Sequence, residues 1–229
     1  MTFTLAGISS MATRQVLADL AGAYEQRTGL RIAIRSMGGV DAARLIRAGE
    51  PTDLVVLARN AMEQLEDEGH IAPGTPAGFA RSGMAVAVPS GAPRPGIDDG
   101  ESVRQAILQA GRICYSTGPS GDHLMRLLEQ WGIRTTVSER LLQAAPGVPV
   151  AAMLSRGEAD LGFQQLSELL HAPGIEIIGP LPPEIQAVTV FTAGVSSTSP
   201  RQEEARALVA YLTSPEAAAA KRRHGMEPA

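Results

Sequence analysis

Short apolar segments alternate with amphipathic helical segments from the beginning of the chain, and this alternation constrains the fold most. A strand predicted at residues 2–6 precedes a helical stretch whose apolar residues recur on one face: Val16, Leu17, Leu20, Ala21 and Tyr24. Further strands are predicted at residues 30–35 and 53–57, around a helix that ends near Gly49. This β-α-β-α-β series predicts an α/β fold with a mostly parallel sheet flanked by helices, whose ligands bind at the carboxyl ends of the strands.

The same plan restarts in the middle of the chain. A helix at residues 61–68 and an apolar strand at 84–88 lead to a proline-rich loop at 89–95, which marks a boundary. Helices at 103–110 and 124–131 then surround a strand at 112–115, and a strand at 186–195 leads to helices at 202–211 and 215–223. We therefore expect a discontinuous first lobe, residues 1–83 plus 191–229, and a second lobe, residues 84–190. The strands at 84–88 and 186–195 are the expected hinges.

Two segments of the chain resemble each other. Residues 39–50 (GVDAARLIRAGE) align without gaps on residues 147–158 (GVPVAAMLSRGE), and each copy leads to a strand that begins near Asp53 or Asp160. The match predicts one equivalent helix in each lobe, opened and closed by glycine. Two related lobes explain the match; a chance similarity of so short a segment is the alternative.

Composition and motifs exclude several classes of function. The net charge is −4, and 3% of the residues are aromatic, so neither nucleic acid nor an anionic membrane surface is an expected partner. The chain lacks both the Gly-Lys-Ser/Thr ending of a P-loop and a Gly-x-Gly-x-x-Gly after a strand, so nucleotide binding is not expected. It also lacks the Gly-x-Ser-x-Gly motif, so serine hydrolysis is not expected. Its four histidines are isolated from one another and from Cys114, so no metal and no cofactor are predicted.

Neither a membrane-spanning segment nor an export signal is visible in the sequence. No apolar run approaches the roughly 20 residues that cross a bilayer, so membrane insertion is not expected. The expected location is cytoplasmic, or periplasmic if a signal has been removed.

Four segments share one design, in which a strand ends in small or hydroxyl residues and a helix begins. The free N–H groups and the positive dipole end of such helices attract anions, and several of them converging on a cleft predict an anion site. Ordinary capping is the alternative for any single segment, and Ser9 or Ser10 is expected to cap the first long helix. The ligand-binding residues predicted on this ground are Ser9, Ser10, Ser36, Met37, Gly38, Gly39, Thr117, Ser120, Gly121, Gly147 and Val148, the last two after Pro146.

Further polar side chains are candidates for the same site. Arg14 lies one turn into the first helix and could reach a carboxylate, and the amides of Gln164 and Gln165 follow a strand at its carboxyl end. His123 lies beside the predicted cleft, where it could move a proton; a solvated helix residue is the alternative.

Four stretches resemble the molybdate-type extracellular solute-binding proteins of ABC transporters: LAGISS at residues 5–10, GEPTDLVV at 49–56, GEADLGF at 157–163 and SPEAA at 214–218. The similarity covers nearly the whole chain. It implies a type II periplasmic-binding-protein fold, with two lobes that close on a ligand like a Venus flytrap. We therefore expect a monomer that delivers its ligand to an ABC permease.

The resemblance also implies a ligand. In molybdate binders, serine hydroxyls and main-chain N–H groups hold the oxyanion, from loops that match Ser9, Ser10 and Ser36, together with a tyrosine. The tyrosine position falls at Gln165, and the first serine loop differs in length. An amide suits a planar or larger organic anion at least as well as a tetrahedral one. The expected ligand is therefore molybdate, a sulfate-like oxyanion or a small organic carboxylate.

A second hypothesis comes from another similarity. The segment GFQQLSEL at residues 162–169 and the ending GMEP at 225–228 look like a subgroup in which some proteins are aconitate isomerases. That similarity implies an isomerase that shifts a double bond in a small unsaturated tricarboxylate by moving one allylic proton. The reaction needs a base, for which His123 and Glu168 are the candidates.

Overall fold

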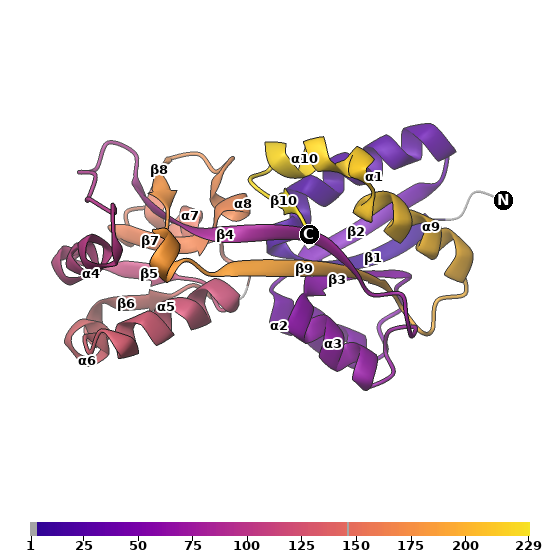
Figure 1. Ribbon diagram of the computed structural model, residues 1–229, viewed down its shortest axis with the longest axis horizontal. Coiled ribbons are helices and arrows are strands. Elements are labelled where there is room, and N and C mark those ends of the chain that lie inside the picture. Colours follow the sequence, from indigo (N-terminus) through magenta and orange to yellow (C-terminus); the bar gives the residue numbers. More distant parts are fainter. Residues whose placement is uncertain (1–3, 146) are drawn as a thin grey trace. The chain divides into compact units, whose positions relative to one another are not determined.

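A computed structural model describes residues 4–145 and 147–229, which divide into two compact units (Figure 1). Unit 1 comprises Met1–Ser82 and Thr189–Ala229, and unit 2 comprises Gly83–Val188. The chain changes unit within β4 (Ala77–Pro89) and at the start of β9 (Val188–Val195). The predicted strand residues 2–3 and Pro146 lie outside the described residues. A cleft that closes about hinges stays a prediction.

Unit 1 contains a sheet with the strand order β2-β1-β3-β9. The first three strands, β1 (Thr4–Ser10), β2 (Arg31–Met37) and β3 (Leu54–Ala58), are parallel, and β9 runs antiparallel to β3. The short strand β10 (Glu227–Pro228) pairs with β4. The helices of this unit are α1 (Arg14–Thr28), α2 (Gly39–Arg47), α3 (Arg59–Asp67), α9 (Gln202–Thr213) and α10 (Ala218–Arg223).

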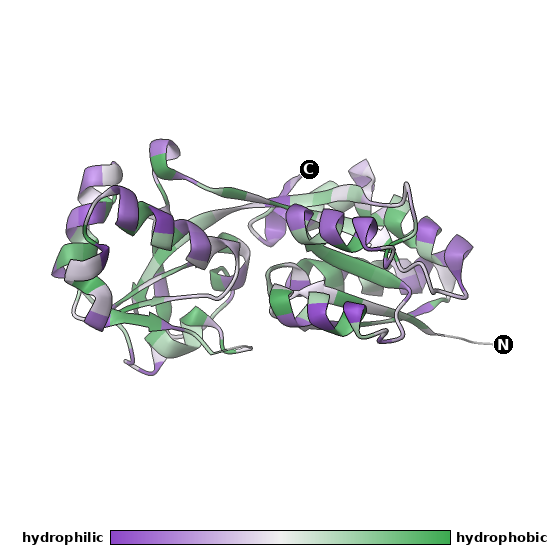
Figure 2. Cartoon of the chain, turned by 90° about the horizontal axis from the view of Figure 1, so that it is seen from below, coloured by the Kyte–Doolittle hydropathy of each residue, from purple (hydrophilic) through white to green (hydrophobic). Residues whose placement is uncertain are grey.

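Both faces of the unit 1 sheet are buried. Along β3, Leu54 and Val56 pack into a core with α1 and α9, whereas Val55 and Leu57 pack into another with α2 and α3. Alternate side chains of a strand point to opposite faces, so a strand buried on both faces must be continuously apolar. Figure 2 shows the result, with hydrophobic strands covered by helices that carry hydrophilic residues. The predicted α/β architecture is confirmed.

Unit 2 contains a sheet with the order β6-β5-β7-β4. Its strands β5 (Ile113–Tyr115), β6 (Leu141–Gln143) and β7 (Leu161–Gln165) are parallel, while β4 and β7 are antiparallel, as are β4 and β8 (Ile175–Pro180). The helices of this unit are α4 (Gly100–Gln109), α5 (Pro119–Gln130), α6 (Arg134–Val137), α7 (Val150–Ser155) and α8 (Leu166–Leu169).

The two units repeat one supersecondary plan. The strands β2, β1, β3 and β9 of unit 1 correspond in order and direction to β6, β5, β7 and β4 of unit 2. The helices α2 and α7 end alike: the N–H of Gly49 donates to Ile46 O at 3.0 Å, and the N–H of Gly157 donates to Leu154 O at 2.9 Å. Both glycines have positive φ, at 79° and 69°. The internal sequence match is therefore structural.

A reciprocal aspartate contact also recurs in both units. Asp53 N–H donates to Ala6 O at 2.8 Å, while its Oδ2 accepts the Ala6 N–H at 2.9 Å. Asp160 and Arg112 make the same pair of bonds, at 2.9 and 2.8 Å. Each aspartate thus fixes the start of one parallel strand against its neighbour, at the end of the sheet opposite the carboxyl ends.

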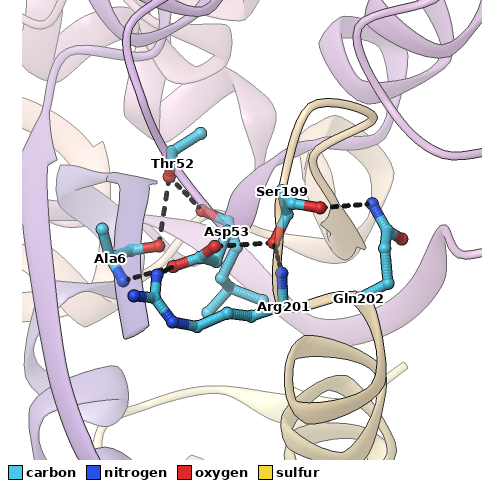
Figure 3. A network of polar contacts seen from close by, with 7 residues as sticks. Ala6, Thr52, Asp53, Ser199, Arg201 and Gln202 are labelled. Atoms are coloured by element: carbon cyan, nitrogen blue, oxygen red, sulfur yellow. Dashed lines mark hydrogen bonds and ion pairs between the residues drawn. The ribbon is translucent and has the colours of Figure 1, made fainter. Parts of the chain in front are cut away.

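In unit 1 this contact is part of a larger buried network (Figure 3). Asp53 Oδ1 accepts the Ser199 hydroxyl at 2.6 Å, and Arg201 Nη1 lies 3.7 Å from Oδ2. Thr52 Oγ1 donates to the carbonyls of Ala6 and Leu54, at 3.2 and 3.0 Å. The carboxylate of Asp53 is 3% exposed, whereas Asp160 is an exposed residue. The same contact is therefore buried in one unit and solvated in the other.

The structure corrects several predicted elements. The helix predicted to open at Gly147 begins at Val150, because Gly147 adopts a positive φ of 79° in a turn. The helix predicted from residue 124 begins at Pro119, and the strand predicted at 84–88 extends over Ala77–Pro89. The strands β6, β8 and β10 are absent from the prediction, since short strands at sheet edges carry a weak periodic signal.

We predict that Asp53→Ala lowers the free energy of unfolding by about 3 kcal/mol, because it leaves buried donors without their acceptor. Asp160→Ala should cost only about 1 kcal/mol, since water can replace an exposed carboxylate. Urea unfolding followed by circular dichroism measures both losses. Equal losses for the two variants would show that burial does not set the strength of this contact.

Candidate functional site

Two serine hydroxyls meet at the carboxyl ends of β1 and β2. Ser9 and Ser36 are register partners on these parallel strands, and their Oγ atoms lie 2.8 Å apart. Ser9 is fully buried and Ser36 is half-buried. Only one of the two hydroxyl protons is needed for the bond between them. The Ser9 hydroxyl can also donate to Ser10 O, at 3.4 Å. When it donates to Ser36 instead, the proton of the half-buried Ser36 hydroxyl is left for a ligand.

The helix starts beside these serines carry no side-chain cap. Ser10 precedes a 3-10 turn, Met11–Thr13, without capping it, so the predicted cap by Ser9 or Ser10 is wrong. The Ser9 hydroxyl is instead held at Ser36, and the Ser10 carbonyl accepts the Thr13 hydroxyl at 2.9 Å. The helix α2 likewise begins after Gly38 without a side-chain cap. By contrast, α4 has a complete capping box built on Asp99. The uncapped N–H groups are available to an anion.

The remaining predicted residues of unit 1 lie around the same strand ends. Met37 ends β2 and packs, half-buried, against the core shared with α2 and α3. Gly38 and Gly39 are half-buried, and Val40 behind them is 70% exposed. Arg14 begins α1 with an exposed side chain.

Unit 2 has its own hydroxyl pair at the carboxyl end of β5. Ser116 Oγ lies 2.8 Å from Ser120 Oγ, and it accepts the N–H of Gly118 at 3.4 Å. Ser120 is 2% exposed, and Thr117 is half-buried beside it. Ser116 was not among the predicted residues. The signal that could have found it is a hydroxyl residue directly after a strand, the same signal that selected Ser10.

Gly121 lets α5 approach the end of β5 closely. A Cβ atom at Gly121 would lie 1.9 Å from the carbonyl oxygen of Ser116, which is a direct clash with backbone. At Gly118 the nearest atom to an added Cβ is Ser116 Oγ, at 4.0 Å. The sharp turn from β5 into α5 therefore depends on glycine at position 121.

Gln164 is engaged at both ends of its side chain within unit 2. Its Oε1 accepts the N–H of Val150, the first residue of α7, at 3.2 Å. Its Nε2 donates to Glu168 Oε2 at 2.6 Å. Val148 N–H donates to Ala145 O at 2.9 Å, and Gly147 is exposed in its turn. Gln165 is 3% exposed at the end of β7. The α7 region is thus organised by internal bonds around Gln164.

Glu168 is a candidate for proton transfer because the pKa of its carboxyl group is raised. Burial alone raises the pKa of its carboxyl to about 7. The group can therefore both accept and release a proton near neutral pH. The other proton-transfer candidate, His123, is half-buried and holds its Nε2 2.7 Å from the Ile185 carbonyl. Because a carbonyl can only accept, Nε2 must carry a proton there.

The structure places the predicted residues in two groups. Ser9, Ser10, Arg14 and residues 36–39 belong to unit 1, and the others belong to unit 2. Across residues 4–145 and 147–229, no cluster of three or more His, Cys, Asp or Glu side chains could hold a metal ion. In the same residues no helix is both long enough and apolar enough to cross a bilayer.

We predict that Gly121→Ala destabilises the protein by about 2 kcal/mol or more, because the added methyl group must displace the strand-end backbone. Gly118→Ala is the matched control, with an expected loss below about 1 kcal/mol. Thermal unfolding of both variants measures the difference. Similar melting temperatures for the two would contradict the close approach of α5 to β5.

The chain is similar to known proteins in sequence and in structure. A family model described as bacterial extracellular solute-binding protein matches residues 5–227. An aconitate isomerase from Pseudomonas sp is 37% identical over 234 residues, which cover 98% of this chain and 88% of that protein. The molybdate-binding protein ModA of Escherichia coli (strain K12) is 23% identical over 212 residues, which cover 90% of this chain and 82% of that protein.

A solved structure shows the same fold. The periplasmic molybdate-binding protein of Azotobacter vinelandii superposes with a TM-score of 0.81 over 97% of this chain and 98% of its own, at 22% identity. The predicted periplasmic-binding-protein fold is therefore confirmed. Because the family model spans nearly all of the sequence, the chain belongs to the family of bacterial extracellular solute-binding proteins.

Proposed function

We propose that this solute-binding protein binds a small carboxylate anion through the serine hydroxyls and uncapped main-chain N–H groups of its strand ends. The observation that carries the proposal is the Ser9–Ser36 hydroxyl pair, 2.8 Å apart beside the uncapped start of α2. Ser116 and Ser120 supply a second pair of the same kind in unit 2. Neutral donors and helix dipoles can stabilise an anion without a bound metal or a cluster of basic residues.

The nature of the anion is argued from the residue at the end of β7. The resemblance to molybdate binders implies a tyrosine at the position of Gln165, and a primary amide offers both a donor and an acceptor where a phenol offers one hydroxyl. Such an amide suits a carboxylate that carries further polar groups. The aconitate isomerase at 37% identity is named for a small tricarboxylate, which supports the same choice over molybdate.

The family supplies the cellular context of the proposal. Its members are described as extracellular solute-binding proteins, which supports a periplasmic location and delivery of the ligand to an ABC permease. We propose a monomer for this role.

Ligand binding can be tested with cis-aconitate, trans-aconitate, citrate, molybdate and sulfate by isothermal titration calorimetry. We expect a carboxylate to bind most tightly, and Ser9→Ala or Ser36→Ala to weaken it by about 1 kcal/mol each, since each removes one hydrogen-bonding hydroxyl. Arg14→Ala should cost more only if Arg14 contacts the carboxylate.

Ser197→Ala is the matched control, because Ser197 is exposed and its N–H donates to His70 O in a different part of unit 1. The proposal fails if none of the five anions binds below the millimolar range. It also fails if Ser36→Ala and Ser197→Ala bind the best ligand equally well.

A second function, isomerisation of aconitate, is favoured by Glu168. Its carboxyl carries a pKa of about 7 and is oriented by the 2.6 Å bond from Gln164. In this reaction the carboxylate form of Glu168 removes a proton from the methylene carbon of the substrate. The electron pair shifts along the allylic system, and the same carboxyl returns the proton to the other end. One C–H bond breaks and one forms, so the step needs no oxidant or reductant.

We predict that the rate of cis- to trans-aconitate conversion rises with pH through about 7, as Glu168 loses its proton and becomes the base. Glu168→Gln should lower the rate by about 100-fold or more and leave the dissociation constant nearly unchanged. His123→Gln should keep most of the activity, because His123 Nε2 is committed to the Ile185 carbonyl. Proton NMR of the two isomers during long incubation measures all three.

Unchanged isomers after that incubation, in a protein that binds them, would remove the isomerase and leave the binding function in place. Full activity in Glu168→Gln would remove Glu168 as the base.

A further inference from the structure

Unit 1 contains a hollow between α1 and the edge strand β2. Its volume is about 340 Å³. The helix residues that line it recur at intervals of three and four, so they form one stripe along α1, and the strand residues alternate along β2. The lining residues are Arg14, Leu17, Ala18, Ala21, Gly22 and Glu25 from α1, and Ile32, Ile34 and Ser36 from β2. We call this hollow the α1–β2 groove.

Small residues in the middle of α1 keep the groove open. A Cβ atom added at Gly22 would meet nothing within 4 Å. Glycine in a helix interior is destabilising relative to alanine, and no neighbouring atom requires it at this position. Ala18 and Ala21 extend the same gap, opposite the half-buried side chains of Ile32 and Ile34. The middle of the groove is therefore lined by small and aliphatic side chains.

The two ends of the groove differ in charge. Because α1 leads into β2 through a short turn, the start of α1 lies beside the end of β2. Arg14 and Ser36 therefore lie at the same end of the groove. Arg14 makes no hydrogen bond or ion pair with any residue in the described parts of the chain. At the other end, Glu25 Oε1 accepts the N–H of Ile32 at 2.5 Å. The Arg14 end of the groove thus carries a positive charge without an acidic partner among the described residues. At the Glu25 end, the negative charge already accepts the Ile32 N–H.

The backbone of β2 supplies further donors along the groove. β2 is the last strand of its sheet path, and its pairing with β1 uses one side only. The N–H of Ile32 points to the other side, toward Glu25, so the N–H groups of Ile34 and Ser36 point the same way. Glu25 blocks the edge at Ile32, which disfavours a peptide strand added along the whole of β2. A short ligand at the Arg14 end leaves the bond between Glu25 and the Ile32 N–H in place.

We infer that the α1–β2 groove is a binding site for a short aliphatic carboxylate, whose head group is held by Arg14 and whose chain lies between α1 and β2. Arg14 and Glu25 are eleven residues apart, or about 16 Å along the helix, which leaves room for a chain of about eight carbons. The guanidinium forms charge-assisted bonds with the carboxylate, and the alanine and isoleucine side chains remove the chain from water. The groove shares Ser36 with the hydroxyl pair at Ser9, and Arg14 is a candidate for both sites. The aliphatic stretch beyond Arg14 sets the groove apart and does not depend on the function proposed above.

Sodium octanoate is the probe that tests the inference, with the full chain at neutral pH. We expect it to bind and to shift the backbone amide signals of Gly22 and Ile34 in two-dimensional NMR spectra. 1-Octanol, which has the chain without the charge, should bind about tenfold more weakly. Octanoate and trans-aconitate are titrated separately, because both carboxylates can reach Arg14 and Ser36.

Two variants separate the groove from general hydrophobic binding. Gly22→Leu places a side chain in the open space and should weaken octanoate binding by about tenfold or more, whereas Ala23→Leu places the same side chain on the exposed neighbouring position and should have no effect. Arg14→Gln should reduce octanoate affinity to that of octanol. The inference is overturned if octanoate shifts neither amide at millimolar concentration, or if Gly22→Leu binds octanoate as well as Ala23→Leu does.

Discussion

The reciprocal contact between an aspartate and the start of a neighbouring strand is the interaction on which both units depend. Asp53 holds Ala6, and Asp160 holds Arg112, each by a main-chain bond and a carboxylate bond. These contacts set the register of the parallel strands at their amino ends. Because the register is fixed there, the opposite ends of the strands can carry serines, glycines and uncapped helix starts, which contribute less to stability. The proposed binding groups and these register-setting contacts thus lie at opposite ends of the same strands.

The carboxyl ends combine rigid donors with one proton-exchanging group. The hydroxyl pairs in each unit are buried or half-buried, so their positions are fixed before any ligand arrives. Glu168 differs, since burial holds its pKa at about 7 and Gln164 ties it to the start of α7. This contrast is the physical reason for considering catalysis beside binding.

Much of the fold could be predicted from the sequence, because it depends on periodic patterns. The apolar strands, the helix stripe that begins at Val16 and the paired glycine-closed helices are all visible as spacing. The strand β6 and the late start of α7 were missed, since they depend on pairing and on a turn at Gly147. The capping role given to Ser9 or Ser10 was wrong for a related reason. A hydroxyl bonds whichever partner tertiary structure brings nearest, and for Ser9 that partner is Ser36.

The central claim is that a small carboxylate binds to the serine donors at the strand ends. A crystal structure of the protein grown with trans-aconitate tests it most directly. We expect a carboxylate oxygen within hydrogen-bonding distance of the Ser9 or Ser36 hydroxyl and of an N–H group at the start of α2. A ligand bound at saturating concentration that contacts neither serine would contradict it.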